Sequence, residues 1–387
     1  MIPPSAMAGH AWTLLQNGKF DHDIASSLFN IGVATVLAVL LGFTCGLFVH
    51  TVPPLRAALE PLLASYYAVP TFIFYPVFIV VLGALAIGAP VTETSQAFGL
   101  GFWSLIPFTM QMAFVVIGGY VVASSKPASW LIDRLARVPR NGRSAVAWVA
   151  TIWMLASLLN WGLSLVFGGL LVKALARRSD LKMDYRAAGA AAYLGLGAVW
   201  ALGISSSAAQ LQANPASLPP SILAITGVIP FTETIFLWQS ITLTAVLIVV
   251  SLLVAWLTAP VGNSARTARD FGEAAVQAEA PALQPRTRPG EWLEYSPLLT
   301  VLLSLLAFGW LFSEFASKPV AGAIASLNTY NFLFISLGLL LHWRPRSFLN
   351  AVAKAVPSTT GVLIQFPLYG GIAMILTHAA GGDGQTL

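Results

Sequence analysis

The sequence predicts an all-α integral membrane protein that crosses the bilayer many times. Apolar residues make up 57% of its 387 residues and charged residues only 9%, whereas an ordinary soluble domain carries about 25% charged residues. The 20 Lys and Arg and the 15 Asp and Glu are also clustered, so that long segments contain no charge. These segments are 24–55, 61–92, 94–125, 144–172, 187–232, 234–265, 295–313, 319–343 and 355–382.

Most of these segments can hold one spanning helix, which needs about 20 mainly apolar residues. We expect about eight spans, near residues 27–49, 62–90, 98–124, 187–206, 234–258, 296–313, 329–343 and 357–380. We expect no cleavable signal peptide, because the first 20 residues contain no basic region followed by an apolar one. The first span would then act as the insertion signal.

The segment 144–172 differs from the others because strongly basic segments flank it on both sides. The basic residues before it are Lys126, Arg134, Arg137, Arg140 and Arg143, and those after it are Lys173, Arg177, Arg178, Lys182 and Arg186. The positive-inside rule places both flanks in the cytoplasm, and a single span would put one of them on the wrong side. We therefore predict a re-entrant hairpin with two half-membrane legs.

The tip of this hairpin is predicted at Asn160, Trp161 and Gly162, close to the middle of the segment. Asn and Gly tolerate a tight reversal of the chain. Non-helical backbone at membrane depth occurs only where it is buried in protein or lines a cavity, so the tip is a candidate functional site. The alternative is one ordinary helix with a polar notch.

The remaining loops divide the chain into parts. We expect an amino-terminal segment at 1–90 with two spans, a first carrier half at 91–258, a cytoplasmic linker at 259–294 and a partial second half at 295–387. Gln111 and Gln365 each precede a glycine pair within an apolar span, and each adjoins a basic loop, which follows Gln111 in one case and precedes Gln365 in the other. This short similarity between the two halves indicates an inverted repeat, as in many secondary transporters. The second half ends before a second hairpin, so the predicted fold is an incomplete inverted-repeat carrier.

The candidate substrate-binding residues are Asn160, Trp161 and Gly162 at the tip, with Gln111 and Gln365 as polar support. At a hairpin tip, we expect two positive helix ends to converge and to favour a carboxylate without a buried Lys or Arg. The alternative for the glycines is helix packing, and for the glutamines it is interhelical hydrogen bonding.

Glu233 is the candidate proton-coupling residue, because it is the only acid between Arg186 and Arg266 and an acid at membrane depth is often a proton site. The alternative is an ordinary helix-start residue at the water interface.

Enzymatic signatures are absent from the sequence. It contains no HExxH, no Walker A sequence, no CxxC and no GxSxG, and its five histidines are scattered. We expect no enzyme activity, no cofactor, no metal site and no nucleic-acid partner. The single cysteine, Cys45, excludes an intrachain disulfide.

The residues from about 95 to the end resemble the short-chain fatty acid transporter family. The matching stretches are GFWSLIPFTMQMA (101–113), LNWGLSLVFGGLLVKALARR (159–178), DYRAAGAAAYLG (184–195), GVIPFTETIF (227–236) and GVLIQFPLYGGI (361–372). The resemblance implies a secondary carrier for small monocarboxylates such as acetoacetate and butyrate, and a fold with paired re-entrant hairpins. The expected location is the bacterial cytoplasmic membrane, with proton symport as a hypothesis and a homo-oligomer as a further expectation.

Residues 11–85 resemble a different family, the amino end of an ABC-importer permease of the nitrate/sulfonate type. The two resemblances meet near residues 80–95. The sequence therefore leaves two alternatives to a carrier. One is an ABC permease subunit that needs an ATPase partner, and the other is a non-functional fusion or fragment with a truncated carboxyl end.

Overall fold

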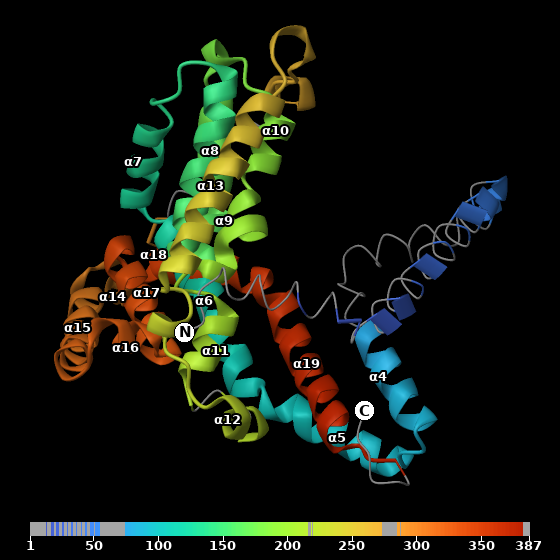
Figure 1. Cartoon of the computed structure of the whole chain (residues 1–387). Helices are drawn as coiled ribbons and strands as arrows, with labels where there is room; N and C mark the ends of the chain where they lie inside the picture. Colours follow the sequence, from blue (N-terminus) through green and yellow to red (C-terminus); the bar gives the residue numbers. More distant parts are fainter. Residues whose placement is uncertain are drawn as a thin grey trace. The chain divides into compact units, whose positions relative to one another are not determined.

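The computed structural model describes residues 74–215, 218, 220–272, 285–286 and 288–381, with isolated residues among the first 54. The chain divides into two units, Met1–Phe72 and Ile73–Leu387, and the second unit contains the helices from α4 (Phe74–Ala86) to α19 (Thr360–His378). The predicted span at 27–49 and the first part of the span at 62–90 lie largely outside the described residues. Helices alone build the described part, with no strand among its elements (Figure 1).

The described part of the chain has six helical segments long and apolar enough to cross a membrane, and three shorter apolar helices. The six are Ile106–Ala123, Gly142–Leu159, Tyr185–Ala213, Trp238–Thr258, Pro289–Ser317 and Pro345–His378. The shorter ones are Phe74–Ala86, Trp161–Ala176 and Leu327–His342. The prediction of an all-helical chain is confirmed for this part, which contains six candidate membrane spans, while the count of eight stays a prediction.

The single helix expected at 98–124 is wrong, because two helices, α5 (Val91–Ser104) and α6 (Ile106–Ala123), meet at Leu105. Leu105 has φ −91° and ψ 1°, outside the helical range of its neighbours. Pro107 follows in the first turn of α6. Its ring removes a backbone donor and restricts the residue before it, which explains a new helix start at this point.

The single helix expected near 187–206 is also wrong in detail. The chain forms α10 (Tyr185–Ala191), a π-helical turn (Gly195–Val199) and a 3₁₀ turn (Trp200–Leu202), and it is extended at Gly203. Two glycines in the π-helical turn lower the local helix propensity, and π-helical turns are frequent at functional sites. The short helices α11 (Ser207–Ala213) and α12 (Pro220–Thr226) follow, and then α13 (Trp238–Thr258).

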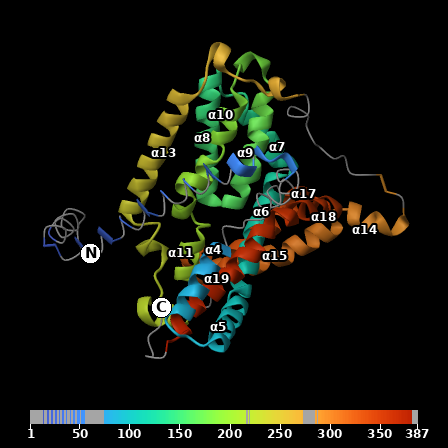
Figure 2. The same cartoon turned by 90° about the vertical axis from the view of Figure 1, so that its right-hand side faces the viewer.

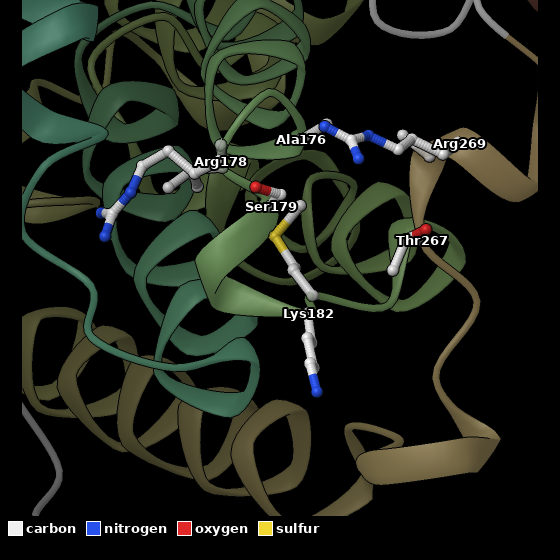
Figure 3. A pocket seen from close by; sticks show the side chains of 9 residues that line it. Ala176, Arg178, Ser179, Lys182, Thr267 and Arg269 are labelled. Carbon is white, nitrogen blue, oxygen red and sulfur yellow. The ribbon is translucent and has the colours of Figure 1, made fainter.

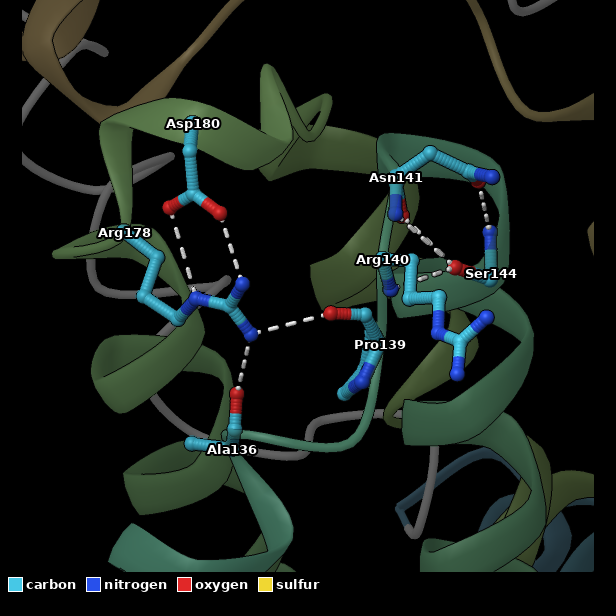
Figure 4. Close-up of polar contacts among 7 residues, drawn as sticks. All are labelled: Ala136, Pro139, Arg140, Asn141, Ser144, Arg178 and Asp180. Carbon is cyan, nitrogen blue, oxygen red and sulfur yellow. Dashed lines mark hydrogen bonds and ion pairs between the residues drawn. The ribbon is translucent and has the colours of Figure 1, made fainter.

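The segment predicted as a hairpin consists of α8 (Gly142–Leu159) and α9 (Trp161–Ala176), which are separated by the extended residue Asn160 (φ −154°, ψ 117°). The two helices run antiparallel, because Gly168 of α9 packs directly on Trp153 of α8. The two basic flanks lie together, since Arg178 donates to the carbonyls of Ala136 and Pro139, both at 2.9 Å (Figure 4).

The hairpin legs are longer than the half-membrane legs we expected. With 18 and 16 residues they are about 27 and 24 Å long, at 1.5 Å per residue, against about 30 Å of hydrocarbon. A hairpin of this length returns the chain to its starting side. Both basic flanks then lie on the same side of the membrane, as the positive-inside rule requires. The position of the tip within the bilayer stays a prediction.

Two amphipathic helices lie in segments that the sequence analysis treated as basic loops. These are α7 (Lys126–Leu135), which begins at the cap residue Ser125, and α18 (Pro345–Ala355). Both begin with a proline in the first turn, where proline is favoured because its missing N–H is not needed.

The second half consists of α15 (Leu298–Ser317), α16 (Val320–Ala325), α17 (Leu327–His342), α18 and α19. Helix α19 packs along α5 (Figure 2), and a Cβ on Gly101 would collide with the carbonyl of Gly370. Helix α19 runs opposite to α5 and α6, because Phe366 also contacts Phe108. The predicted linker 259–294 contains 3₁₀ turns at Gly262–Ser264, Ala268–Phe271 and Pro289–Glu291 in its described residues.

Candidate functional site

The hairpin tip lies against the backbone of α6. Asn160 is fully buried, and its side-chain Oδ1 accepts from the N–H of Leu163 at 2.8 Å, which caps α9. A Cβ on Gly119 of α6 would collide with the Leu163 nitrogen and with Oδ1 of Asn160. A Cβ on Gly162 would lie 2.8 Å from the carbonyl oxygen of Val115. Glycine at both positions therefore allows this close approach.

The extended segment after the π-helical turn also binds the tip. The N–H of Ile204 donates to the carbonyl of Leu158 at 2.8 Å, and the N–H of Trp161 donates to Oγ of Ser205 at 2.9 Å. Nε2 of Gln210 donates to the carbonyl of Ile204 at 2.7 Å, while its Oε1 is buried without a partner. The non-helical backbone of this segment is thus held by backbone groups of the hairpin and by the side chain of Gln210 from α11.

The second half of the chain reaches the tip through Tyr330 of α17. Its buried hydroxyl donates to the carbonyl of Leu159 at 2.7 Å and lies next to the side chains of Asn160 and Ser205. The tip is therefore formed by four segments: the hairpin, α6, α17 and residues 203–206. Neither Ser205 nor Tyr330 was predicted as a site residue. A run of three serines after Gly203 was the only visible signal for the first, and Tyr330 had none.

The expected convergence of two positive helix ends is wrong. Helix α9 begins at the tip, but α8 ends there, so α8 presents its carbonyl end with a partial negative charge. The last carbonyls of α8, at Leu158 and Leu159, accept from Ile204 and Tyr330. In the first turn of α9, the N–H of Trp161 donates to Ser205 and the N–H of Leu163 donates to Asn160. One helix amino end, and not two, therefore faces the tip.

Gln111 belongs to a second polar cluster, between α6 and α17. Its Nε2 donates to Oδ1 of Asn328 at 2.8 Å, and its backbone carbonyl accepts from Nδ2 of Asn331 at 2.7 Å. Gln365 is half-buried on α19 and takes no part in this network. The structure thus pairs Gln111 with α17, and the substrate-binding role of both glutamines stays a prediction.

Glu233 is exposed in the 3₁₀ turn Phe231–Glu233 that precedes α13. No other described part of the protein covers its side chain, and the proton-coupling role stays a prediction. No group of His, Cys, Asp and Glu in the described ranges could hold a metal ion.

A pocket of about 120 Å³ lies at the base of the hairpin, at the far end of α9 from the tip (Figure 3). Lys182 and Arg269 are among its lining residues, while Arg178 pairs with Asp180 at 2.6 Å. Beside it, buried Asp184 accepts from the N–H groups of Ala187 and Arg266, both at 2.8 Å. These contacts join the linker to α10, and they are separate from the tip.

Known proteins with similar sequences identify the family. The model of the short chain fatty acid transporter family matches residues 60–387. The chain belongs to this family. A provisionally assigned short-chain fatty acid transporter of Escherichia coli K12 is 33% identical over 290 residues, which are 74% of this chain and 63% of the relative. A Haemophilus influenzae protein of the same description is 28% identical over 289 residues, 73% and 63% of the two chains. No solved structure matches the chain.

The family membership confirms the predicted resemblance and extends it. The match begins at residue 60 and not near 95, so it overlaps the segment 11–85, for which an ABC-permease resemblance was predicted. That second resemblance, and the fusion inferred from it, stay predictions. The chain spans less than two thirds of the length of the two relatives.

Proposed function

We propose that this chain carries short-chain monocarboxylates, of the acetoacetate and butyrate type, across the bacterial cytoplasmic membrane. Membership of the transporter family supports transport, and the description of the relatives supports the substrate class. Several apolar helices support a multi-pass location. We place the substrate at the hairpin tip, and the hairpin is proposed to be re-entrant.

The observation that carries this proposal is the composition of the tip. Asn160, Ser205 and Tyr330 are buried polar residues from three separate segments, and none of them carries a charge at neutral pH. No residue of the tip supplies a counter-charge, so a buried carboxylate is costly there and a second carboxylate would add the same cost again. The tip therefore suits a small acid with one charge and an apolar remainder.

Counterflow in vesicles tests the transport function without knowledge of the coupling ion. Purified protein is reconstituted, the vesicles are loaded with unlabelled butyrate, and the entry of labelled butyrate is measured. We expect entry well above that of protein-free vesicles, inhibition by acetoacetate and no inhibition by succinate. Entry equal to that of protein-free vesicles would refute the proposed function.

Proton coupling through Glu233 is tested separately with an imposed pH gradient. If protons drive uptake through this carboxyl group, Glu233→Gln loses gradient-driven accumulation and retains counterflow. Glu93→Gln is the matched control, because Glu93 is an exposed acid at the start of α5. Accumulation by Glu233→Gln at the wild-type level would remove Glu233 from the coupling mechanism.

A further inference from the structure

We propose that His342 is a pH-sensitive clamp at the carboxyl end of α17. Its neutral imidazole holds the ends of α6 and α17 and the start of α18 together, and the gain of a proton releases α18. Nε2 of His342 lies 2.9 Å from the carbonyl oxygen of Val121 in α6, and Nδ1 lies 2.8 Å from Oγ of Ser347 in α18. One half-buried side chain thus joins three helices.

The local packing brings these groups to one place. Helices α6 and α17 approach closely one turn before His342, because a Cβ on Gly338 would lie 2.7 Å from Cγ1 of Val121. Trp343, directly after α17, has a left-handed backbone conformation (φ 63°), which residues other than glycine rarely adopt. The chain turns sharply there and α18 begins two residues later, so Ser347 lies beside the imidazole.

The two hydrogen bonds fix the tautomer of the neutral ring. The Val121 carbonyl only accepts, so Nε2 of His342 carries the hydrogen and Nδ1 accepts from the Ser347 hydroxyl. An imidazole gains a proton near neutral pH, and Nδ1 then becomes a donor. The bond to Val121 is retained, but the Ser347 hydroxyl must turn its hydrogen away from the ring. Protonation therefore acts on the contact between α17 and α18.

No carboxylate pairs with His342 to stabilise an imidazolium. The ion pairs in the described part of the chain do not include it, and α6 contains no charged residue. The charged residues on α7, α14 (Trp292–Tyr295), α15, α18 and the turn before α18 are Lys126, Asp133, Arg134, Glu294, Glu314, Arg344, Arg346 and Lys354. Glu294 and Glu314 are already paired with Arg346 and Lys318. Cations outnumber acids here and burial also disfavours a charged ring, so protonation favours release of α18 into water.

The clamp acts on helices that also hold the hairpin tip. Val121 lies two residues after Gly119, which packs on the tip, and Tyr330 of α17 donates to the carbonyl of Leu159. The same two helices therefore carry the titratable group and position the tip. The clamp does not depend on which substrate is transported.

Cysteine labelling of the full chain tests the inference. In a Cys45→Ser background, Ala351→Cys places a thiol at a buried position of α18, one turn after Ser347 on the same face. Asn350→Cys places a thiol at an exposed position of the same helix. The ratio of the two maleimide rates removes the effect of pH on the thiol itself. We expect this ratio to rise up to about tenfold per pH unit as the pH falls from about 8 to about 5.

Three variants decide whether His342 causes this change. His342→Gln retains a donor and an acceptor but cannot titrate, so its ratio should not change with pH. His378→Gln removes an exposed histidine of α19 and should keep the wild-type dependence. Ser347→Ala should raise the ratio at neutral pH about 2- to 10-fold, as the loss of one hydrogen bond predicts, and it tests the clamp alone if His342→Gln does not fold.

A wild-type ratio that is independent of pH would overturn the inference. The same pH dependence in His342→Gln as in the wild type would also overturn it, and so would a neutral-pH ratio in Ser347→Ala equal to that of the wild type.

Discussion

Removal of the Tyr330 hydroxyl should free the hairpin tip. In the wild type this hydroxyl donates to the carbonyl of Leu159 at 2.7 Å, and it is the direct hydrogen bond from α17 to the end of α8. Tyr330→Phe retains the ring and leaves the carbonyl buried and unpaired, at a cost of about 1–3 kcal/mol. If the cost is relieved when the tip separates from α17, the separated state becomes about 5- to 150-fold more populated, at about 1.4 kcal/mol per tenfold.

A buried cysteine at the tip measures this population. Cys45→Ser removes the single native thiol, and Ser164→Cys then introduces a thiol of similar size at a fully buried position. When the tip opens and closes faster than the reagent reacts, the rate of maleimide labelling is proportional to the population of the separated state. We expect Tyr330→Phe to raise the labelling rate about 5- to 150-fold, in proportion to the population of the separated state.

The control for this measurement is Tyr369→Phe, which removes an exposed hydroxyl on α19. It should leave the labelling rate of the Ser164→Cys thiol unchanged. A rate with Tyr330→Phe equal to that of the control would show that α17 does not hold the tip. The reasoning about the contact between the two halves would then be refuted.

Two further predictions concern stability in detergent. Gly101→Val should separate α5 from α19 at the contact with Gly370, destabilise the fold by about 1–3 kcal/mol and so lower the melting temperature. Gly99→Val is the control and should have little effect, because no atom lies near the added Cβ. Burial raises the pKa of Asp184, but the Arg186 guanidinium and two backbone N–H groups outweigh it and hold the pKa below 3.8. The stabilisation from this carboxylate is therefore present above its unfolded pKa and lost as the pH falls through the lower folded value, so Asp184→Ala should flatten the decline of the melting temperature in acid.

The hairpin could be predicted from the sequence because its evidence is local. Basic residues on both flanks of one apolar segment require a chain reversal, and Asn160 is a favourable residue for the break. The basic flanks were read only as loops, however, so the amphipathic helices α7 and α18 were missed. The break at Leu105 was also missed, although Pro107 was a visible signal for it.

The composition of the tip could not be predicted, because it depends on contacts between residues far apart in the sequence. Tyr330 follows Leu159 by more than half of the second unit, and no pattern near Tyr330 indicates its partner. Gln111 was selected as a polar residue in an apolar span, and its partners Asn328 and Asn331 were not. Periodicity and charge fix which segments are helical, but the pairing of buried polar groups is decided by packing.

The most direct test of the account is protection of the tip by substrate. With Cys45→Ser and Ser164→Cys in the full chain, the rate of maleimide labelling is measured across a range of butyrate concentrations. If the tip binds a short monocarboxylate, labelling slows with increasing butyrate and saturates, and succinate at equal ionic strength has no effect. A labelling rate independent of butyrate, in a protein that shows butyrate counterflow, would place the substrate elsewhere and contradict the account.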